Sequence, residues 1–390
     1  MADVRPFAAI RYDFQRFGLA ELVCPPYDVI SQAQAQSLRG RRYNAIHLEL
    51  PEGEGRAKYE QAARLWARWR SEGVLVAESK PAFYAVEERF KLGSRGYSRS
   101  GFLAALGVTP EAAEDIIPHE RTLSKPKEDR LEMLRAVKAN ISPIFGIFPD
   151  PGAAIRSALR RAATGRPVVS GQSALGVRYR LWRVSDPRTI SSIRGRLAGR
   201  KILIADGHHR LEVGKAFYQE NPSASAETIL AYFCPEEDKG LVMLPTHRIV
   251  EGDLARREPE ALSRCRLLPC SGRQALLKRL SASANPYAFG FFDDGFTLAV
   301  PRGSDGCRSG LCVEWIGKVL LHRHAPDAIR YTHDAAEAVE TAKRDKAAAV
   351  FVKPAPVSQV RKAVKAIGLL PPKSTYFYPK IGTGLVFKGL

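Results

Sequence analysis

The stretch KILIADGHHRLEVGKAFYQE, residues 201–220, decides how the centre of this chain folds. KILIA is a short apolar run of the kind that forms a buried strand, and LEVGKAFYQE has the apolar spacing of a helix. The turn between them consists of Asp206, Gly207, His208, His209 and Arg210. Gly207 permits a tight turn and a close backbone approach. The stretch therefore predicts a strand, a turn and a helix in direct succession.

This junction also predicts an anion site. The first N–H groups of a helix have no partner within the helix and carry a partial positive charge, so they attract phosphate. Arg210 adds a fork of donors that suits phosphate oxygens. We assign Asp206, Gly207 and Arg210 to phosphate or nucleotide binding. We assign His208 and His209 to catalysis, because imidazoles can donate or carry protons. In the alternative, Asp206 caps the helix and the histidines are solvated.

A second polar segment is PHERTLSKPK, residues 118–127. A carboxylate beside a histidine can act as a general base towards a hydroxyl, so Glu120 and His119 are catalytic candidates. Lys125 and Lys127 could neutralise phosphate charge. In the alternative, a hydroxyl of this segment caps the helix that follows and Glu120 is solvated.

Three further groups are candidates for ligand contact. Thr246, His247 and Arg248 end an apolar strand and are assigned to phosphate or nucleotide binding; the alternative is a surface pair at a strand end. PPKSTYFYPK, residues 371–380, interleaves aromatic residues with lysines. Such a segment can stack on a ring and hold phosphate, or it can pack its aromatic rings in the core. From it we assign Lys373, Ser374 and Thr375 to the substrate. Tyr27 and Asp28, after two prolines, are assigned likewise, with a rigid turn as the alternative.

Composition excludes several classes of protein. The 390 residues include 60 Lys or Arg and 41 Asp or Glu, a net charge of +19. This excess favours anionic partners, although an arginine-rich codon bias would explain it too. No apolar run is long enough to span a membrane, and the N-terminus lacks the apolar core of a signal peptide, so we expect a cytoplasmic protein. The six cysteines show no CxxC spacing and are expected to be free thiols.

The order of predicted elements indicates an α+β protein in three regions: an N-terminal α+β region at 1–110, a catalytic core at 111–250 and a C-terminal α+β region at 251–390. Helices are expected at 59–72, 128–140, 335–345 and 358–367, and a hairpin turn at Asp294-Gly295. Asp334 is expected to cap the third of these helices, and Gly368 to end the fourth. The motifs of P-loop, Rossmann, zincin and serine-hydrolase enzymes do not occur.

Several motifs, in this order, resemble a widespread prokaryotic family of conserved proteins long described as of unknown function. The resemblance covers about residues 4–390. The motifs are CPPYDVI, IIPHERT, KANISPIFG, ADGHHR, LPTHR and PPKSTYFYPK. That family is similar to the ParB/sulfiredoxin-like fold and, within it, to the free-serine kinases. Those kinases phosphorylate L-serine to O-phosphoserine with a nucleoside diphosphate or triphosphate as the donor.

The resemblance implies roles for particular residues. Gly207, His208, His209 and Arg210 match a phosphate-binding turn that opens a helix in that fold. His119 and Glu120 are similar in position to a segment whose carboxylate serves the serine hydroxyl. DGHHR lacks the cysteine of sulfiredoxins, which argues against sulfinic-acid repair. No helix-turn-helix module is evident, which argues against ParB-type DNA binding.

We therefore expect a ParB/sulfiredoxin-like central domain and a phosphotransferase that acts on serine, O-phosphoserine or a similar hydroxylated metabolite. The phosphate partner is ATP, ADP or diphosphate, and Asp206 is the candidate ligand for Mg²⁺. Glu120, His208 and His247 are expected to line one cleft. The alternative function is a regulator that binds nucleotide or nucleic acid without catalysis. The sequence does not specify the metal or the oligomeric state.

Overall fold

The computed structural model describes residues 2–120, 122, 124–325 and 328–390. The described chain forms two compact units. Unit 1 consists of Met1–Pro118, Thr122–Val242 and Pro379–Leu390, and unit 2 consists of His119–Arg121 and Met243–Tyr378. The three-region division expected from the sequence differs from this one, because strands on both sides of residue 110 join the same sheet.

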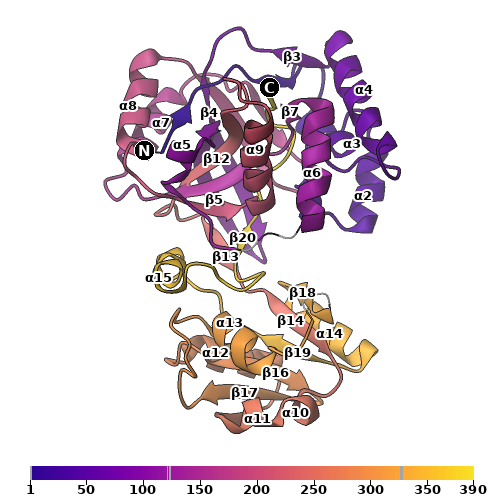
Figure 1. Cartoon of the computed structure of the whole chain (residues 1–390), viewed down its shortest axis with the longest axis vertical. Coiled ribbons are helices and arrows are strands. Elements are labelled where there is room, and N and C mark those ends of the chain that lie inside the picture. Colours follow the sequence, from indigo (N-terminus) through magenta and orange to yellow (C-terminus); the bar gives the residue numbers. More distant parts are fainter. Residues whose placement is uncertain (1, 121, 123, 326–327) are drawn as a thin grey trace. The chain divides into compact units, whose positions relative to one another are not determined.

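Unit 1 is built on a nine-stranded mixed sheet in the described part of the chain (Figure 1). The order is β6-β11-β8-β12-β5-β4-β10-β9, with β1 beside β5. Most neighbours are antiparallel, but β12 pairs with β8, and β11 with β6, in parallel. The strands are β1 (Val4–Arg5), β4 (Phe83–Leu92), β5 (Arg95–Gly107), β6 (Ile116–Ile117), β8 (Ile144–Phe148), β9 (Val169–Gln172), β10 (Arg178–Val184), β11 (Ile202–Asp206) and β12 (Thr228–Pro235).

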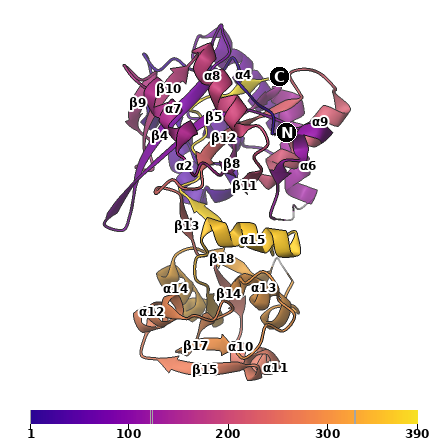
Figure 2. The same cartoon turned by 90° about the vertical axis from the view of Figure 1, so that its left-hand side faces the viewer.

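Helices and two short strand pairs complete unit 1. The helices are α1 (Leu19–Leu22), α2 (Gln32–Arg39), α3 (Ile46–Glu49), α4 (Ala57–Ser71), α5 (Pro110–Ala113), α6 (Ser124–Val137), α7 (Ala154–Ala162), α8 (Pro187–Leu197) and α9 (His208–Glu220), with a short 3-10 turn at Tyr27–Val29. The short strands are β2 (Ile10–Tyr12), β3 (Leu75–Ala77), β7 (Ala139–Asn140) and β21 (Lys388–Gly389). Helices α6 and α9 lie side by side (Figures 1 and 2).

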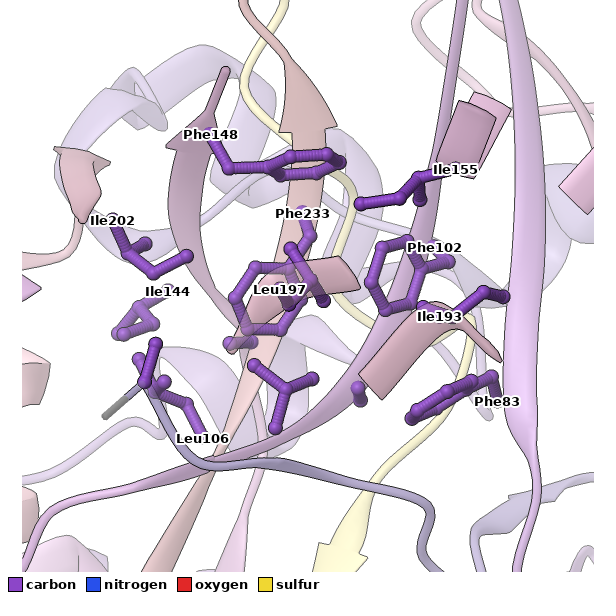
Figure 3. Packing of buried hydrophobic residues seen from close by; sticks show 14 of the residues in the cluster. Phe83, Phe102, Leu106, Ile144, Phe148, Ile155, Ile193, Leu197, Ile202 and Phe233 are labelled. Atoms are coloured by element: carbon purple, nitrogen blue, oxygen red, sulfur yellow. The ribbon is translucent and has the colours of Figure 1, made fainter. Parts of the chain in front are cut away.

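One face of this sheet packs against α7 and α8. Phe102 and Phe233 stack with ring centroids 5.1 Å apart. Ile155 from α7 and Ile193 and Leu197 from α8 point towards these rings (Figure 3). Each fully buried aliphatic side chain contributes roughly 1.5–3 kcal/mol, so this layer is a main source of stability for unit 1.

Unit 2 contains a six-stranded sheet with the order β15-β17-β16-β19-β14-β18 among its described residues. Its core joins Leu276 and Leu280 of α12 and Ala338 and Ala342 of α14 to the apolar face of the sheet. The strands are β13 (Val242–Leu244, which begins at the last residue of unit 1), β14 (His247–Glu251), β15 (Cys265–Cys270), β16 (Phe289–Asp293), β17 (Gly295–Pro301), β18 (Arg330–Thr332), β19 (Ala347–Phe351) and β20 (Tyr376–Tyr378). The helices are α10 (Leu254–Arg257), α11 (Pro259–Ser263), α12 (Arg273–Ala282), α13 (Cys312–Trp315), a π-helix (Ile316–Leu320), α14 (Ala335–Asp345) and α15 (Val357–Ile367).

Local signals placed several of these elements correctly. Asp334 caps α14 by accepting hydrogen bonds from two backbone N–H groups. Gly368 follows α15 with φ of 78°, and Asp294 turns the β16–β17 hairpin with φ of 58°. The α+β class is confirmed. Within the described residues, every helix falls short of the length and apolarity that crossing a bilayer requires.

Candidate functional site

The predicted strand–turn–helix junction is formed by β11, Gly207 and α9. Gly207 has φ of 89°, a left-handed conformation that favours glycine, and an added Cβ would lie 2.9 Å from Ile144 Cγ2. The helix begins at His208, one residue after Gly207. The two histidines and Arg210 therefore lie in the first turn of α9 and not in the loop before it. His208 is only 8% exposed.

A buried lysine joins this junction to a distant part of unit 1. Lys380 Nζ lies 2.5 Å from Asp206 Oδ1 and also donates to Asp28 Oδ2. Arg210 Nη2 donates to Asp206 Oδ2 at 2.6 Å, and Arg210 Nη1 donates to the carbonyl oxygen of Pro143 at 2.6 Å. We call Asp28, Asp206, Arg210 and Lys380 the Lys380 cluster. It places two cations against two carboxylates at the N-terminal end of α9.

These pairings set the charge of the cluster. Burial alone would raise the pKa of the Asp206 carboxyl, but Lys380 and Arg210 outweigh burial and hold that pKa well below its ordinary value. Burial alone would lower the pKa of Lys380, but Asp206 and Asp28 prevail and raise it. Asp206, Arg210 and Lys380 are therefore charged at neutral pH. The side chains of Lys380 and Asp206 are only 9% and 13% exposed.

A second buried ion pair anchors the segment that carries Lys380. Arg99 and Glu88 are fully buried and form two hydrogen bonds, of 2.7 and 2.9 Å. Arg99 Nη2 also donates to the carbonyl oxygen of Pro379 at 2.7 Å. Because Pro379 directly precedes Lys380, this bond helps to hold the lysine in place.

Tyr27 borders the same cluster. Its backbone N–H donates to Glu49 Oε1 at 3.0 Å, and the Arg130 guanidinium lies 4.5 Å from the centre of its ring. Burial raises the pKa of the Tyr27 hydroxyl. A cavity of about 60 Å³ lies nearby, lined by Glu49, Arg130 and Arg210 together with apolar side chains of α6 and α9. This volume is enough for an ordered water or a small group.

In unit 2, the segment His119-Glu120 is bonded to the Lys373–Thr375 segment. Glu120 Oε1 accepts a hydrogen bond from the backbone N–H of Lys373 at 3.0 Å. His119 Nε2 lies 2.7 Å from the Thr375 hydroxyl, and His119 is fully buried. Ser374 donates to the carbonyl oxygen of Pro371 at 2.6 Å. Two motifs more than 250 residues apart in sequence are thus neighbours.

The third motif lies close to this segment. Arg248 is 4% exposed, and its guanidinium donates to the carbonyl oxygens of Thr246 and, at 3.4 Å, of Lys373. His247 is 2% exposed; its Nδ1 accepts from the Val352 N–H at 3.3 Å. Burial, and to a smaller extent the nearby Arg248, lower the pKa of His247 to about 4. This pair is therefore inside unit 2, and the interpretation as a surface pair is wrong.

The family described as "Protein of unknown function (DUF1015)" matches residues 4–298. The chain belongs to this family. The curated proteins include no match to it.

Solved structures similar to this family member have low identity and low TM-scores. A conserved hypothetical protein from Pyrococcus furiosus is 16% identical, with a TM-score of 0.39, over 73% of this chain and 95% of that one. A free serine kinase in complex with ADP is 15% identical, with a TM-score of 0.41, over 73% and 92%. SbnI from Staphylococcus aureus, truncated at its C-terminus, is 10% identical, with a TM-score of 0.41, over 72% and 85%. At these scores the likenesses assign no function to the chain.

The predicted site residues fall into two groups. Unit 1 contains Tyr27, Asp28, Lys127, Asp206, Gly207, His208, His209 and Arg210, and unit 2 contains His119, Glu120, Thr246, His247, Arg248, Lys373, Ser374 and Thr375. Lys127 lies in the first turn of α6, while the side chain of Lys125 is outside the described residues. The expectation that Glu120, His208 and His247 line one cleft stays a prediction.

Two expectations for the junction need revision. Both terminal nitrogens of Arg210 already have partners, so Arg210 would have to exchange one of them to bind phosphate. Both carboxylate oxygens of Asp206 face cations, so Asp206 does not fit the Mg²⁺ ligand that we predicted. The described residues also contain no group of three or more His, Cys, Asp or Glu side chains that could hold a metal. We derive no step through a metal ion.

Sequence reasoning did not assign Lys380 or Arg130 to the site. Lys380 ends the motif PPKSTYFYPK, but only Lys373, Ser374 and Thr375 were assigned from that motif. The available signal was a lysine after proline in a segment already linked to ligand binding. Nothing local in the sequence distinguishes the buried Lys380 from Lys373, because burial depends on how the C-terminal segment packs in unit 1.

Proposed function

We propose that this protein is a small-molecule phosphotransferase, and that the Lys380 cluster with the start of α9 holds the transferring phosphate. The observation that carries the proposal is the buried ammonium of Lys380, which lies between Asp28 and Asp206 at the N-terminal end of α9. Phosphoryl transfer is catalysed mainly by positioning and by neutralising charge on the phosphate oxygens. Cations that are fixed in place before the substrate binds need little reorganisation during the reaction.

The arrangement supports a specific division of labour. In this proposal the partial positive charge that the helix dipole places at the N-terminal end of α9 attracts the phosphate oxygens. Asp28 and Asp206 hold Lys380, and Asp206 also holds Arg210. In this proposal the phosphate replaces part of those contacts, so that both cations turn towards it.

The identity of the substrate rests on the sequence motifs. Their resemblance to the free-serine kinases favours the hydroxyl of serine as the acceptor and ATP, ADP or diphosphate as the phosphate partner. The proposal keeps the ParB/sulfiredoxin-like description for the central region at 111–250. It also keeps Glu120 as the general base, on its residue type and sequence context. The serine oxygen would attack phosphorus, the bond to the leaving group would break, and the hydroxyl proton would pass to the base.

The test incubates the full chain with L-serine and, in turn, ATP, ADP or diphosphate, and monitors each reaction by phosphorus NMR. We expect O-phosphoserine with at least one donor. Lys380→Met keeps the length of the side chain and removes its charge, so turnover should fall by about 10²-fold, as when one preorganised donor is lost.

Lys388→Met is the matched control. Lys388 is also a buried lysine of the C-terminal segment, but it donates to the carbonyl oxygen of Ser225 at 2.7 Å. This variant should retain turnover. The proposal is wrong if wild type transfers no phosphoryl group from any donor, or if Lys380→Met equals wild type. Binding of nucleotide without turnover, or DNA affinity that collapses with salt, would favour the regulator instead.

A further inference from the structure

A groove of about 330 Å³ lies between helix α7 and strands β4, β5 and β10 of unit 1. Its size falls at the lower end of the range for small-molecule sites. The side chains that matter for its chemistry are Ser98, Ser100, Arg156, Arg160, Arg180 and Trp182. None of these residues belongs to the Lys380 cluster or to the predicted site.

The groove and the Lys380 cluster use opposite faces of the sheet. Successive side chains of a strand point to opposite faces. Arg99 of β5 reaches the carbonyl oxygen of Pro379, the residue before Lys380. Ser98 and Ser100 flank Arg99 on the same strand, so they project to the other face. The groove is therefore a separate site, and its proposal does not depend on the proposed phosphotransferase activity.

Two arginines of α7 line this groove without a direct salt-bridge partner, although Arg156 attracts the Asp238 carboxylate over a longer distance. Arg156 and Arg160 are four residues apart, so they lie on the same face of the helix. Arg180 is paired with Glu87 at 2.7 Å, and Glu87 also pairs with Arg89. Among the described residues, by contrast, Arg156 and Arg160 have no carboxylate within salt-bridge distance. The groove therefore has an excess of positive charge on one wall.

The positions of these arginines do not favour the helix. Arg156 lies in the first turn of α7, which has no acidic residue, and a cation there opposes the helix dipole. Two like charges at this spacing also repel each other, at a cost of roughly 0.2–0.5 kcal/mol. The Asp150 carboxylate, which accepts from the N–H groups of Ile155 and Arg156, and the attraction between Arg156 and Asp238 offset part of this cost. An anion bound between the two arginines would reduce the remaining repulsion.

The wall opposite α7 is aromatic. Trp182 is 9% exposed, and its indole N–H donates to the carbonyl oxygen of Gly165 at 3.3 Å. The Arg180 guanidinium lies 5.4 Å from the centre of the indole ring. The hydrogen bond and the cation–π contact hold the ring in place, and the small part of it that remains accessible lines the groove. Ser98 and Ser100 add hydroxyl groups to the floor of the groove.

We propose that this groove binds a small aromatic anion, with its phosphate or carboxylate between Arg156 and Arg160 and its ring against Trp182. Guanidinium groups bind such anions through paired, charge-assisted hydrogen bonds, which fits two arginines at one end of the groove. The ring distinguishes this ligand from a free inorganic anion.

The test is calorimetric titration of the full chain with phenyl phosphate, and with benzoate as the carboxylate arm. We expect saturable binding of at least one of them, and binding of inorganic phosphate at least tenfold weaker, because it lacks the ring. Arg156→Ala/Arg160→Ala should weaken the binding of the ring compound at least tenfold. Arg161→Ala, an exposed arginine of the same helix outside this groove, is the control and should leave binding unchanged.

Two further readouts complete the test. The double variant should melt within a few degrees of wild type without ligand, because the repulsion it loses offsets the loss of the attraction between Arg156 and Asp238. Lys380→Met should still bind the ring compound, since it changes the other face of the sheet. The proposal is overturned if wild type binds neither ring compound, if inorganic phosphate binds as tightly, if the double variant binds like wild type or melts several degrees lower, or if Lys380→Met abolishes the binding.

Discussion

Lys380→Met tests whether the Lys380 cluster is the electrostatic centre of unit 1. The variant leaves Asp28 without the ammonium that it shares with Asp206, while Arg210 still pairs with Asp206 at 2.6 Å. Methionine has nearly the same length, so the change removes charge and not volume. We therefore expect a loss of stability that comes from unpaired carboxylates.

The structure sets the size of this loss. Removing one partner of a buried ion pair costs about 3–5 kcal/mol. The lower end applies here, about 3 kcal/mol, because Arg210 remains beside Asp206 and because the Asp28 side chain is 26% exposed. For a unit of this size, that loss lowers the melting temperature by about 6–12 °C. Asp28→Asn added to Lys380→Met removes the orphaned carboxylate and should recover part of the loss.

The pH dependence has a definite sign. The pKa of Asp206 is lowered on folding, so its contribution is present above the ordinary pKa and is lost as the pH falls below about 4. The pKa of Lys380 is raised on folding, so its contribution is present at neutral pH and is lost only as the pH rises above about 10.4. The difference between wild type and Lys380→Met should therefore be flat from about pH 5 to 9 and shrink on either side.

Calorimetry or circular dichroism over this pH range measures the effect, with Lys388→Met as the control. The reasoning fails if Lys380→Met melts with wild type across the whole range. It also fails if adding Asp28→Asn destabilises the protein further, because an orphaned charge would then not be the cause.

Three other outcomes are expected. His247→Phe should reduce the acid sensitivity of unit 2. The folded pKa of His247 is about 4, so the stability that the neutral imidazole contributes, at most roughly 3 kcal/mol, is complete above about pH 6.5 and is lost as the pH falls towards 4. A urea-unfolding profile with the same pH dependence as wild type would contradict this. Gly207→Ala should lower the free energy of unfolding by more than about 1 kcal/mol, because of the left-handed backbone and the contact with Ile144. Gly195→Ala in α8 has open space around the added methyl group and should raise it by up to about 1 kcal/mol, so equal shifts in melting temperature would refute this reasoning. Glu120→Gln should lower turnover by about 10²–10⁴-fold with little change in melting temperature, since glutamine can still accept the hydrogen bond from the Lys373 N–H. A lower melting temperature with normal turnover would show that Glu120 has a structural role instead.

Sequence alone determined the local elements and the chemical nature of the candidate site. The apolar run of β11, the glycine after it and the helical spacing of α9 depend on neighbouring residues, so they were predictable. The same holds for Asp334 at the start of α14, because a cap bonds to N–H groups two or three residues away. Where local signals were ambiguous, the prediction erred: the helix begins at His208, which places Arg210 within its first turn.

Only the tertiary structure decided which charges meet. Lys380 and Asp28 are 352 residues apart in sequence, and no local pattern links them. Asp206 was considered as a candidate Mg²⁺ ligand from its sequence context alone, whereas in the fold its charge is already balanced by Lys380 and Arg210. The division into units is likewise non-local, since β5 pairs with both β4 and β12 and so joins strands on both sides of residue 110. Periodicity and capping act within a turn or two of the chain, whereas ion pairing and burial depend on how distant segments pack, and that information lies in the whole fold.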